Sequence, residues 1–225
     1  MLIGGREGKK SLIQLSLEKS LWKFLSGKRK LNFIVKEYPN SEYYLEQCKQ
    51  IVTGYQRLSA KGYLVPPTAR IIQFDQEKLY LLLTDMRRGG KYRVWGLSAH
   101  MTHEQTQELL NMGISAENFF QIRDAARNFI IKTVVDGVYY SDDTLHLYQE
   151  VETGIFHIGF LDLYTWQGSL DVEQRTEMSL NRLNRFLDFV SSEVPAQINF
   201  SLIEFNEVIG EINKILKSKK QRRGV

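Results

Sequence analysis

Short apolar runs bounded by polar turns dominate the first third of the chain. They are rich in Leu, Ile, Val and aromatic residues, as is typical of strands, and they lie at residues 31–38, 69–74 and 78–84. Residues 40–60 differ, because their apolar side chains recur every three or four positions, which is the period of a helix. Asn40 and Ser41 offer this helix an N-cap, and Gly62 offers a C-terminal stop. The pattern therefore predicts strand, helix, strand, strand.

The second half of the chain carries longer apolar patterns with helical spacing. They predict helices at residues 102–112, 115–135, 171–190 and 200–216. Two short apolar runs, residues 144–148 and 155–161, flank a turn at residues 152–154 and predict a β-hairpin within this helical part. Residues 87–91 (RRGGK) form a polar, glycine-containing break, which is the expected boundary between the two halves.

This order of elements predicts an α+β fold in two parts. Residues 1–88 would form a small sheet with one flanking helix, and residues 89–225 a mostly helical part with one hairpin. Residues 12–25 mix leucines with charged residues at no clear period, so a strand, a hairpin and a short helix all remain open there.

Composition excludes several classes of protein. Hydrophobic residues make up 43% of the chain and charged residues 25%, as in ordinary globular domains. The apolar runs are too short to span a membrane, and no apolar block of a signal peptide follows the N-terminus. The single cysteine, Cys48, rules out an intramolecular disulfide and a cysteine-rich zinc site. We expect a cytoplasmic protein; one delivered into a host cytosol by a secretion system would look the same.

The net charge of +4 is modest, and much of it lies in residues 217–225, which we expect to form a basic tail after the last helix. Such a tail could contact nucleic acid or anionic lipid, although a solvated terminus is the more common case. The rest of the chain is close to neutral, which argues against a dedicated nucleic-acid binder. We therefore do not expect nucleic acid as the main partner.

Lys36 stands out because it lies inside an apolar strand. Alternation places it on the same face as Ile34. Such a lysine usually extends its amine to the sheet edge, but a carboxylate on the following helix could hold the ammonium and present it to a polyphosphate. Glu42 and Glu46 lie four positions apart on that helix, so either could pair with Lys36. We favour Glu46, which is a full turn inside the helix.

Aspartates flank the predicted hairpin. Asp142 and Asp143 lie between a long helix and the first strand, and Asp162 follows the second strand. Carboxylates at these positions could converge on one cleft, with Asp162 on a divalent cation and Asp142 beside a hydroxyl nucleophile. Turn aspartates often only cap backbone groups, and for Asp143 alone we favour that role. Asp162 has apolar neighbours in the chain, Leu161 and Leu163, so its carboxylate is costly without a partner.

In order and spacing these features resemble the protein-kinase-like fold, particularly its minimal bacterial members and the aminoglycoside-phosphotransferase branch. IGGREG at residues 3–8 looks like a degenerate glycine-rich loop. Its residues that would contact the nucleotide are Gly4, Gly5 and Gly8. Lys36 resembles the strand lysine that contacts ATP phosphates, and Glu46 or Glu42 is similar to its helix partner.

Three further segments continue the resemblance. LLLTDM at residues 81–86 is similar to the stretch that leads to the adenine-contacting hinge. The residues that would contact the nucleotide there are Asp85 and Met86. GVYYSD at residues 137–142 resembles the catalytic loop, with Tyr140 in place of the usual His. LDLY at residues 161–164 resembles the metal-binding Asp-Phe-Gly segment.

The resemblance implies a two-lobe kinase-like fold with a truncated helical C-lobe. It implies a phosphotransferase that uses ATP and Mg²⁺ or Mn²⁺ to phosphorylate a hydroxyl on a protein or small-molecule acceptor. Asp142 would orient that hydroxyl, and Asp162, together with Asp143, would hold the cation. Leu147 stands where the family has a metal-binding Asn, so a non-catalytic pseudokinase is one alternative. An unrelated α+β interaction module is another, since the chain is 12% aromatic.

Overall fold

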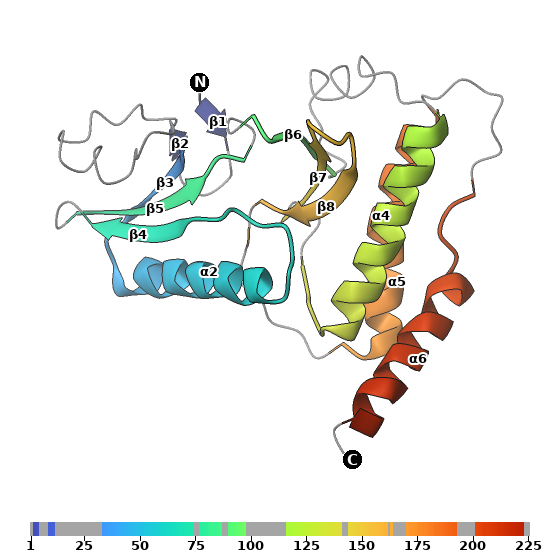
Figure 1. The fold of residues 1–225 in the computed structure, drawn as a ribbon. Coiled ribbons are helices and arrows are strands. Elements are labelled where there is room, and N and C mark those ends of the chain that lie inside the picture. The colour runs from blue at the N-terminus through green and yellow to red at the C-terminus, as the bar shows by residue number, and fades with distance from the viewer. Residues whose placement is uncertain are drawn as a thin grey trace. The chain divides into compact units, whose positions relative to one another are not determined.

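The computed structural model consists of two compact units (Figure 1). It describes residues 2–4, 9–11, 33–73, 77–86, 90–97, 116–140, 144–161, 163, 170–192 and 201–222. The division between the units falls between Val94 and Trp95, a few residues beyond the break that the sequence predicts at residues 87–91. The α+β class is confirmed, since the chain contains antiparallel sheets and α-helices.

Unit 1 (Met1–Val94) is built, in its described residues, on a five-stranded sheet. Its strands are β1 (Leu2–Gly4), β2 (Lys9–Ser11), β3 (Phe33–Pro39), β4 (Ala69–Gln73) and β5 (Lys78–Thr84). They pair antiparallel in the order β1-β2-β3-β5-β4. β5 lies between β3 and β4, and its fully buried residues are Leu79, Leu81, Leu82 and Leu83. The strands predicted near residues 31–38, 69–74 and 78–84 are therefore confirmed.

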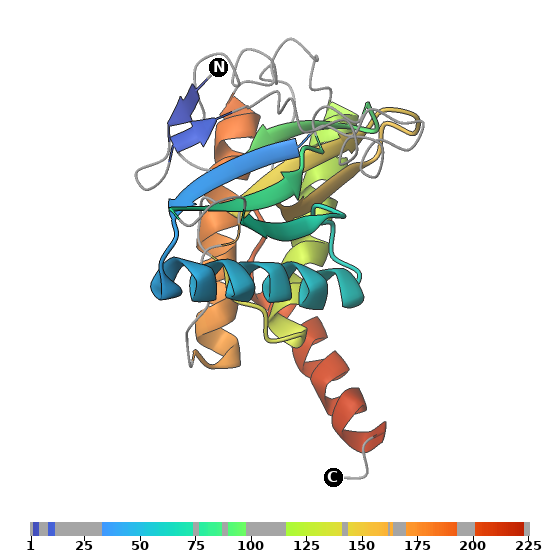
Figure 2. The same ribbon diagram turned by 90° about the vertical axis from the view of Figure 1, so that its left-hand side faces the viewer.

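Helix α2 (Glu42–Ala60) lies along one face of this sheet (Figure 2). The Ser41 hydroxyl accepts a hydrogen bond from the Tyr44 amide at 3.4 Å and caps the N-terminus, as the sequence predicts. Gly62, at φ +73°, lets the chain turn away at the other end. α2 packs against β4 and β5. The side chains of its buried face are Cys48, Ile51, Tyr55 and Leu58.

Unit 2 (Trp95–Val225) combines long helices with a β-hairpin. Its elements include α4 (Ala116–Val135), β7 (Leu145–Glu150), β8 (Phe156–Phe160), α5 (Val172–Ser192) and α6 (Phe205–Arg222). α4 packs against α5, α6 and β8 through fully buried side chains that include Phe119, Ile122, Ala126 and Ile130. The predicted hairpin is confirmed, with Leu147 opposite Ile158. None of the helices in the described residues is long and apolar enough to cross a membrane.

Strand β6 (Tyr92–Gly96) is an element that the sequence analysis did not anticipate. Among the described residues it completes a three-stranded sheet in the order β6-β7-β8, and the Leu97 amide donates a hydrogen bond to the Leu145 carbonyl at 3.2 Å. Trp95 buries its indole ring almost completely. The helix predicted at residues 102–112 and the ambiguous segment 12–25 lie outside the described residues.

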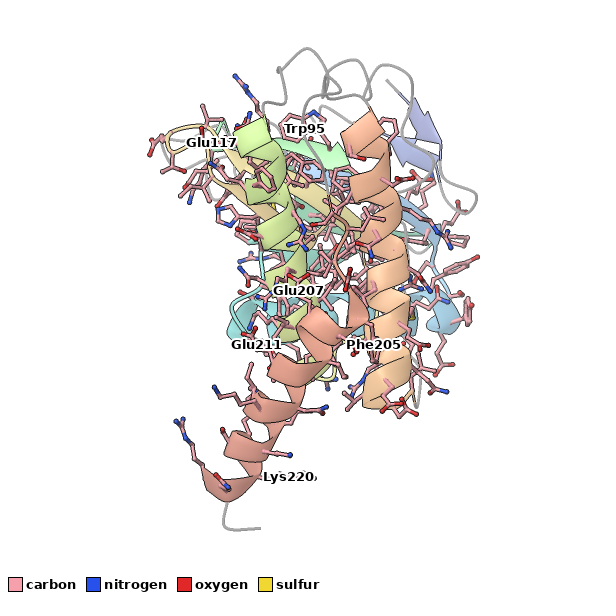
Figure 3. All side chains as sticks on the ribbon, turned by 90° about the vertical axis from the view of Figure 1, so that its right-hand side faces the viewer. Trp95, Glu117, Phe205, Glu207, Glu211 and Lys220 are labelled. Carbon is pink, nitrogen blue, oxygen red and sulfur yellow. The ribbon has the colours of Figure 1, made fainter. Side chains whose placement is uncertain are left out.

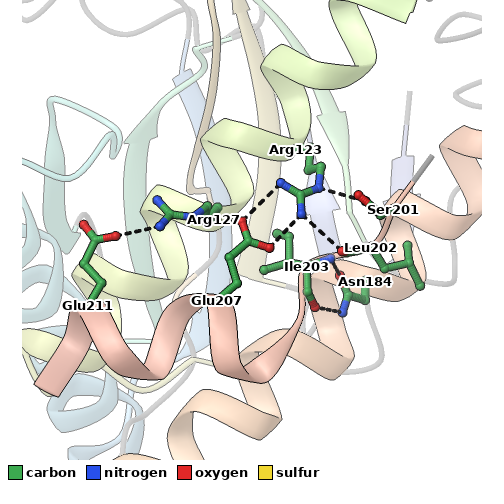
Figure 4. A network of polar contacts seen from close by, with 8 residues as sticks. All are labelled: Arg123, Arg127, Asn184, Ser201, Leu202, Ile203, Glu207 and Glu211. Carbon is green, nitrogen blue, oxygen red and sulfur yellow. Dashed lines mark hydrogen bonds and ion pairs between the residues drawn. The ribbon is translucent and has the colours of Figure 1, made fainter. Parts of the chain in front are cut away.

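An ion-pair network holds α6 against α4 (Figure 4). Arg123 contacts the Glu207 carboxylate at 2.7 Å, and Arg127 contacts the Glu211 carboxylate at 2.6 Å. Arg123 also donates hydrogen bonds to two backbone carbonyls just before α6. Burial alone would raise the pKa of Glu207, but the hydrogen bond and the charge of Arg123 outweigh burial and lower it below the usual value. The start of α6 is therefore fixed by charge-assisted contacts.

The bounds of α6 correct the sequence prediction. We expected a helix over residues 200–216 and a separate basic tail from residue 217, but α6 begins at Phe205 and runs to Arg222. The basic residues belong to the helix because lysine and arginine are good helix formers and their charge interacts favourably with the C-terminal end of the helix dipole. Helix α6 begins later than predicted because the side chains of Arg123 and Asn184 form hydrogen bonds with the backbone of residues 201–203.

Glu207→Gln should lower the free energy of unfolding by about 1–2 kcal/mol at pH 7, because it weakens a charge-assisted hydrogen bond. A carboxylate whose folded-state pKa is lowered contributes stability above its unfolded pKa, near 4.5, and loses it as the pH falls through the folded pKa. The difference between wild type and variant should therefore shrink below that pH. Urea unfolding between pH 7 and pH 3 measures this difference.

The matched control is Glu177→Gln, which changes an exposed carboxylate on α5. It should alter the free energy of unfolding by less than about 0.5 kcal/mol over the same pH range. A Glu207→Gln effect that stays constant down to pH 3 would contradict the ionic origin of the contact.

Candidate functional site

Lys36 lies in the middle of β3 and is only 6% exposed. Its backbone partners are Leu81 on β5 and Lys10 on β2, so the residue is enclosed by strands on both sides. Burial raises the pKa of the Cys48 thiol to about 11, and the charge of Lys36 acts in the opposite direction. The ammonium of Lys36 is therefore within electrostatic reach of α2, the helix that the sequence analysis expected it to face.

The glutamates expected to pair with Lys36 lie elsewhere on α2. The Glu46 side chain is 58% exposed and forms an ion pair with Lys49 at 3.5 Å. Glu42 is also exposed and lies in the first turn, where a negative charge favours the helix dipole. A residue two positions before Cys48 lies on the far side of a helix, so the rotation of α2 directs Glu46 to solvent. The helix presents Cys48, rather than a carboxylate, to the sheet.

Asp85 and Met86 follow directly on β5, and both are buried, at 1% and 6% exposure. β5 is anchored at this end by the Thr84 amide, which donates a hydrogen bond to the Thr68 carbonyl at 3.0 Å. A carboxylate this deeply buried is costly unless polar groups satisfy it. Among the described residues of unit 1, Lys36 and Asp85 are thus the buried members of the charged residue types.

Of the glycines and hairpin-flanking aspartates of the expected site, the structure describes only Gly4. Gly4 is the last residue of β1 and pairs with Lys9 of β2, so residues 5–8 connect two antiparallel strands. The predicted site residues that lie outside the described residues are Gly5, Gly8, Asp142, Asp143 and Asp162.

The segment from Gly137 to Tyr140, which precedes Asp142, is held by two arginines of α5. Arg182 donates a hydrogen bond to the Tyr140 carbonyl and lies over its ring at 5.3 Å. Arg175 lies over the Tyr139 ring at 5.6 Å. Gly137 adopts φ +65°, and a Cβ there would lie 3.1 Å from the Arg175 guanidinium. Backbone conformation and side-chain stacking together fix this segment.

Aromatic packing and a hydrogen bond also hold this segment. The Tyr140 ring contacts Phe129 of α4 and Phe160 of β8, with centroids 5.6 Å and 5.9 Å apart. The Tyr139 hydroxyl donates a hydrogen bond to the Leu170 carbonyl at 2.8 Å. Sequence reasoning missed Arg175 and Arg182. Their spacing of seven residues, which places both on one face of α5, was the available signal.

A hydrogen bond joins the chain segments that flank the predicted aspartates. The Leu161 amide donates to the Thr144 carbonyl at 3.1 Å. Thr144 directly follows Asp143, and Leu161 directly precedes Asp162. This hydrogen bond continues the β7–β8 ladder by one position beyond Leu145 and Phe160.

Arg182→Ala should destabilise the protein by about 1–3 kcal/mol, because it removes a charged hydrogen bond to a backbone carbonyl and a cation–π contact. Amide hydrogen exchange of residues 138–140 should accelerate more than that of the hairpin. Arg185→Ala, which changes an exposed arginine one turn further along α5, is the matched control and should leave both quantities nearly unchanged. Equal effects of the two substitutions would contradict the anchoring role of Arg182.

The described side chains of the candidate site are Lys36, Asp85 and Met86 in unit 1 and the anchored Tyr139 and Tyr140 in unit 2. Comparison with protein-family models and with curated protein sequences finds no match to this chain. The roles of these residues are accordingly argued from their burial, charge and contacts.

Proposed function

We propose that this chain is a small kinase-like phosphotransferase that binds ATP with Mg²⁺ or Mn²⁺ and phosphorylates a hydroxyl group. The observation that carries the proposal is Lys36, a lysine buried in the middle of an antiparallel sheet and within electrostatic reach of α2. The lysine ammonium is a compact point charge that binds phosphate oxygens, so a lysine at this position in the sheet can contact the phosphates of ATP. The order strand, helix, strand, strand over β3, α2, β4 and β5 also supports the small lobe that the resemblance implies.

Nucleotide contacts are assigned to unit 1 in this proposal. Lys36 orients the phosphates, and Asp85 and Met86 contact the adenosine part from the end of β5. Gly4 and the residues that connect β1 to β2 offer backbone amides to the phosphates.

The reacting groups are assigned to the segments around the hairpin of unit 2. Asp142 orients the acceptor hydroxyl, and Asp162 with Asp143 offers hard oxygen ligands, which Mg²⁺ and Mn²⁺ prefer. The hydrogen bond between Thr144 and Leu161 supports this assignment, because it joins residues adjacent to Asp143 and Asp162. A bound cation would neutralise phosphate charge, and the protein would contribute mostly by positioning.

A pseudokinase that binds nucleotide without transfer is the second candidate. Leu147, at the position of the family's metal-binding Asn, is fully buried inside β7 and offers no ligand oxygen. Glu46 lies beside Lys49, so α2 presents Cys48 rather than a carboxylate toward Lys36. Both observations concern catalysis rather than nucleotide binding, so a transfer assay separates the two candidates.

ATP with Mg²⁺ or Mn²⁺ should raise the melting temperature of the wild-type protein. Ligand at a hundredfold excess over its Kd stabilises the native state by about 2.7 kcal/mol. Lys36→Met removes the ammonium and keeps a long apolar side chain, so the variant should fold but lose most of this shift. Lys49→Met, at an exposed lysine of α2, is the control and should keep it. Differential scanning fluorimetry measures all three proteins.

Transfer of radiolabelled phosphate tests the aspartates. Asp162→Asn should abolish transfer and remove the cation-dependent part of the thermal shift, because it removes a negatively charged ligand. Asp142→Asn should keep nucleotide binding and lower the transfer rate by roughly a hundredfold or more. Binding without transfer to any acceptor would support the pseudokinase. Absence of any shift with either cation would contradict the nucleotide site and leave an interaction module.

A further inference from the structure

The C-terminal half of α6 carries an unbalanced positive charge. Beyond Glu211 the helix contains no acidic residue, and its cations are Lys214, Lys217, Lys219, Lys220 and Arg222. All five are exposed, and together they exceed the formal net charge of +4 of the whole chain. This helix end therefore carries more net positive charge than the whole chain.

This helix end extends beyond the helices on which α6 packs, as the position of Lys220 shows (Figure 3). Lys219 forms an ion pair at 3.3 Å with the aspartate that follows α4. By contrast, Lys214, Lys217 and Lys220 make no ion pair within the part of the chain that the structure describes. Like charges at helical spacing repel one another, so a negatively charged partner would stabilise this end of α6.

Lys214, Lys217 and Lys220 form a basic stripe. Their spacing of three residues places them on one side of the helix, away from Ile212, which is buried in the core. The stripe contains no arginine, and no aromatic residue follows Phe205 in α6. It therefore lacks the forked donors and stacking surfaces that nucleic-acid binding commonly uses.

We propose that the basic stripe docks this end of α6 on an anionic lipid bilayer. Lysine side chains are flexible, strongly hydrated point charges, and each one held near a negatively charged leaflet contributes to binding. Leu216, four positions before Lys220 on the helix, is only partly buried, and an apolar side chain of this kind can enter the headgroup region. This site is independent of the proposed kinase-like function.

Co-sedimentation of the full chain with vesicles tests the proposal. The protein should bind vesicles that contain phosphatidylserine and not vesicles of phosphatidylcholine alone, and binding should weaken as the salt concentration rises. Replacing all three lysines of the stripe by Gln should weaken binding roughly a hundredfold, at about fivefold per lysine. Replacing them by Arg keeps the charge and should preserve binding. Equal melting temperatures of the variants verify that each is folded.

Two results would overturn the proposal. One is binding that is equal for both vesicle types or unchanged in the Gln variant. The other is tighter binding to double-stranded DNA than to phosphatidylserine vesicles at the same ionic strength, because this would assign the stripe to a phosphate backbone instead of a lipid surface.

Discussion

Unit 1 buries a lysine side chain inside an apolar sheet, and its proposed function depends on this feature. Lys36 lies opposite Leu81, which is fully buried, and the two flanking strands leave its side chain little access to water. The helix that covers the sheet places the buried Cys48 within electrostatic reach of Lys36, and burial raises the pKa of the Cys48 thiol to about 11. The proposed role of Lys36 in binding phosphate rests on this buried position in the sheet.

Unit 2 is organised around a different requirement, which is to hold a short segment after α4 in one conformation. From α5, Arg175 and Arg182 lie over the rings of Tyr139 and Tyr140, while Phe129 of α4 and Phe160 of β8 contact the Tyr140 ring. Rigid support of this kind favours chemistry that depends on positioning. Helix α4, which carries Phe129, is also held by ion pairs to α6.

The fold could be predicted from sequence wherever local signals decide the structure. The Ser41 cap, the period of α2 and the apolar runs of β3 and β5 act within a few residues, and these elements were predicted close to their observed bounds. β6 was missed because its place depends on pairing with a hairpin some fifty positions further along the chain. The end of α6 was missed because a lysine-rich helix end resembles a solvated tail.

The candidate site was predictable in residue type but not in orientation. That Lys36 would approach α2 follows from strand alternation and chain order, but which face of α2 meets the sheet depends on a rotation set by packing of Cys48, Ile51 and Tyr55. With Cys48 on the buried face, Glu46 lies two positions earlier and therefore on the opposite side of the helix, where it faces solvent.

The central claim, that Lys36 contacts the phosphates of a bound nucleotide, is tested most directly by an acyl-phosphate derivative of ATP. Such a probe transfers its acyl group to an amine that lies beside the bound phosphates, and peptide mapping identifies the modified residue. The account predicts modification at Lys36 that excess ATP with Mg²⁺ suppresses, and modification of the exposed Lys49 that ATP does not affect. Modification confined to exposed lysines, at a level that ATP leaves unchanged, would contradict it.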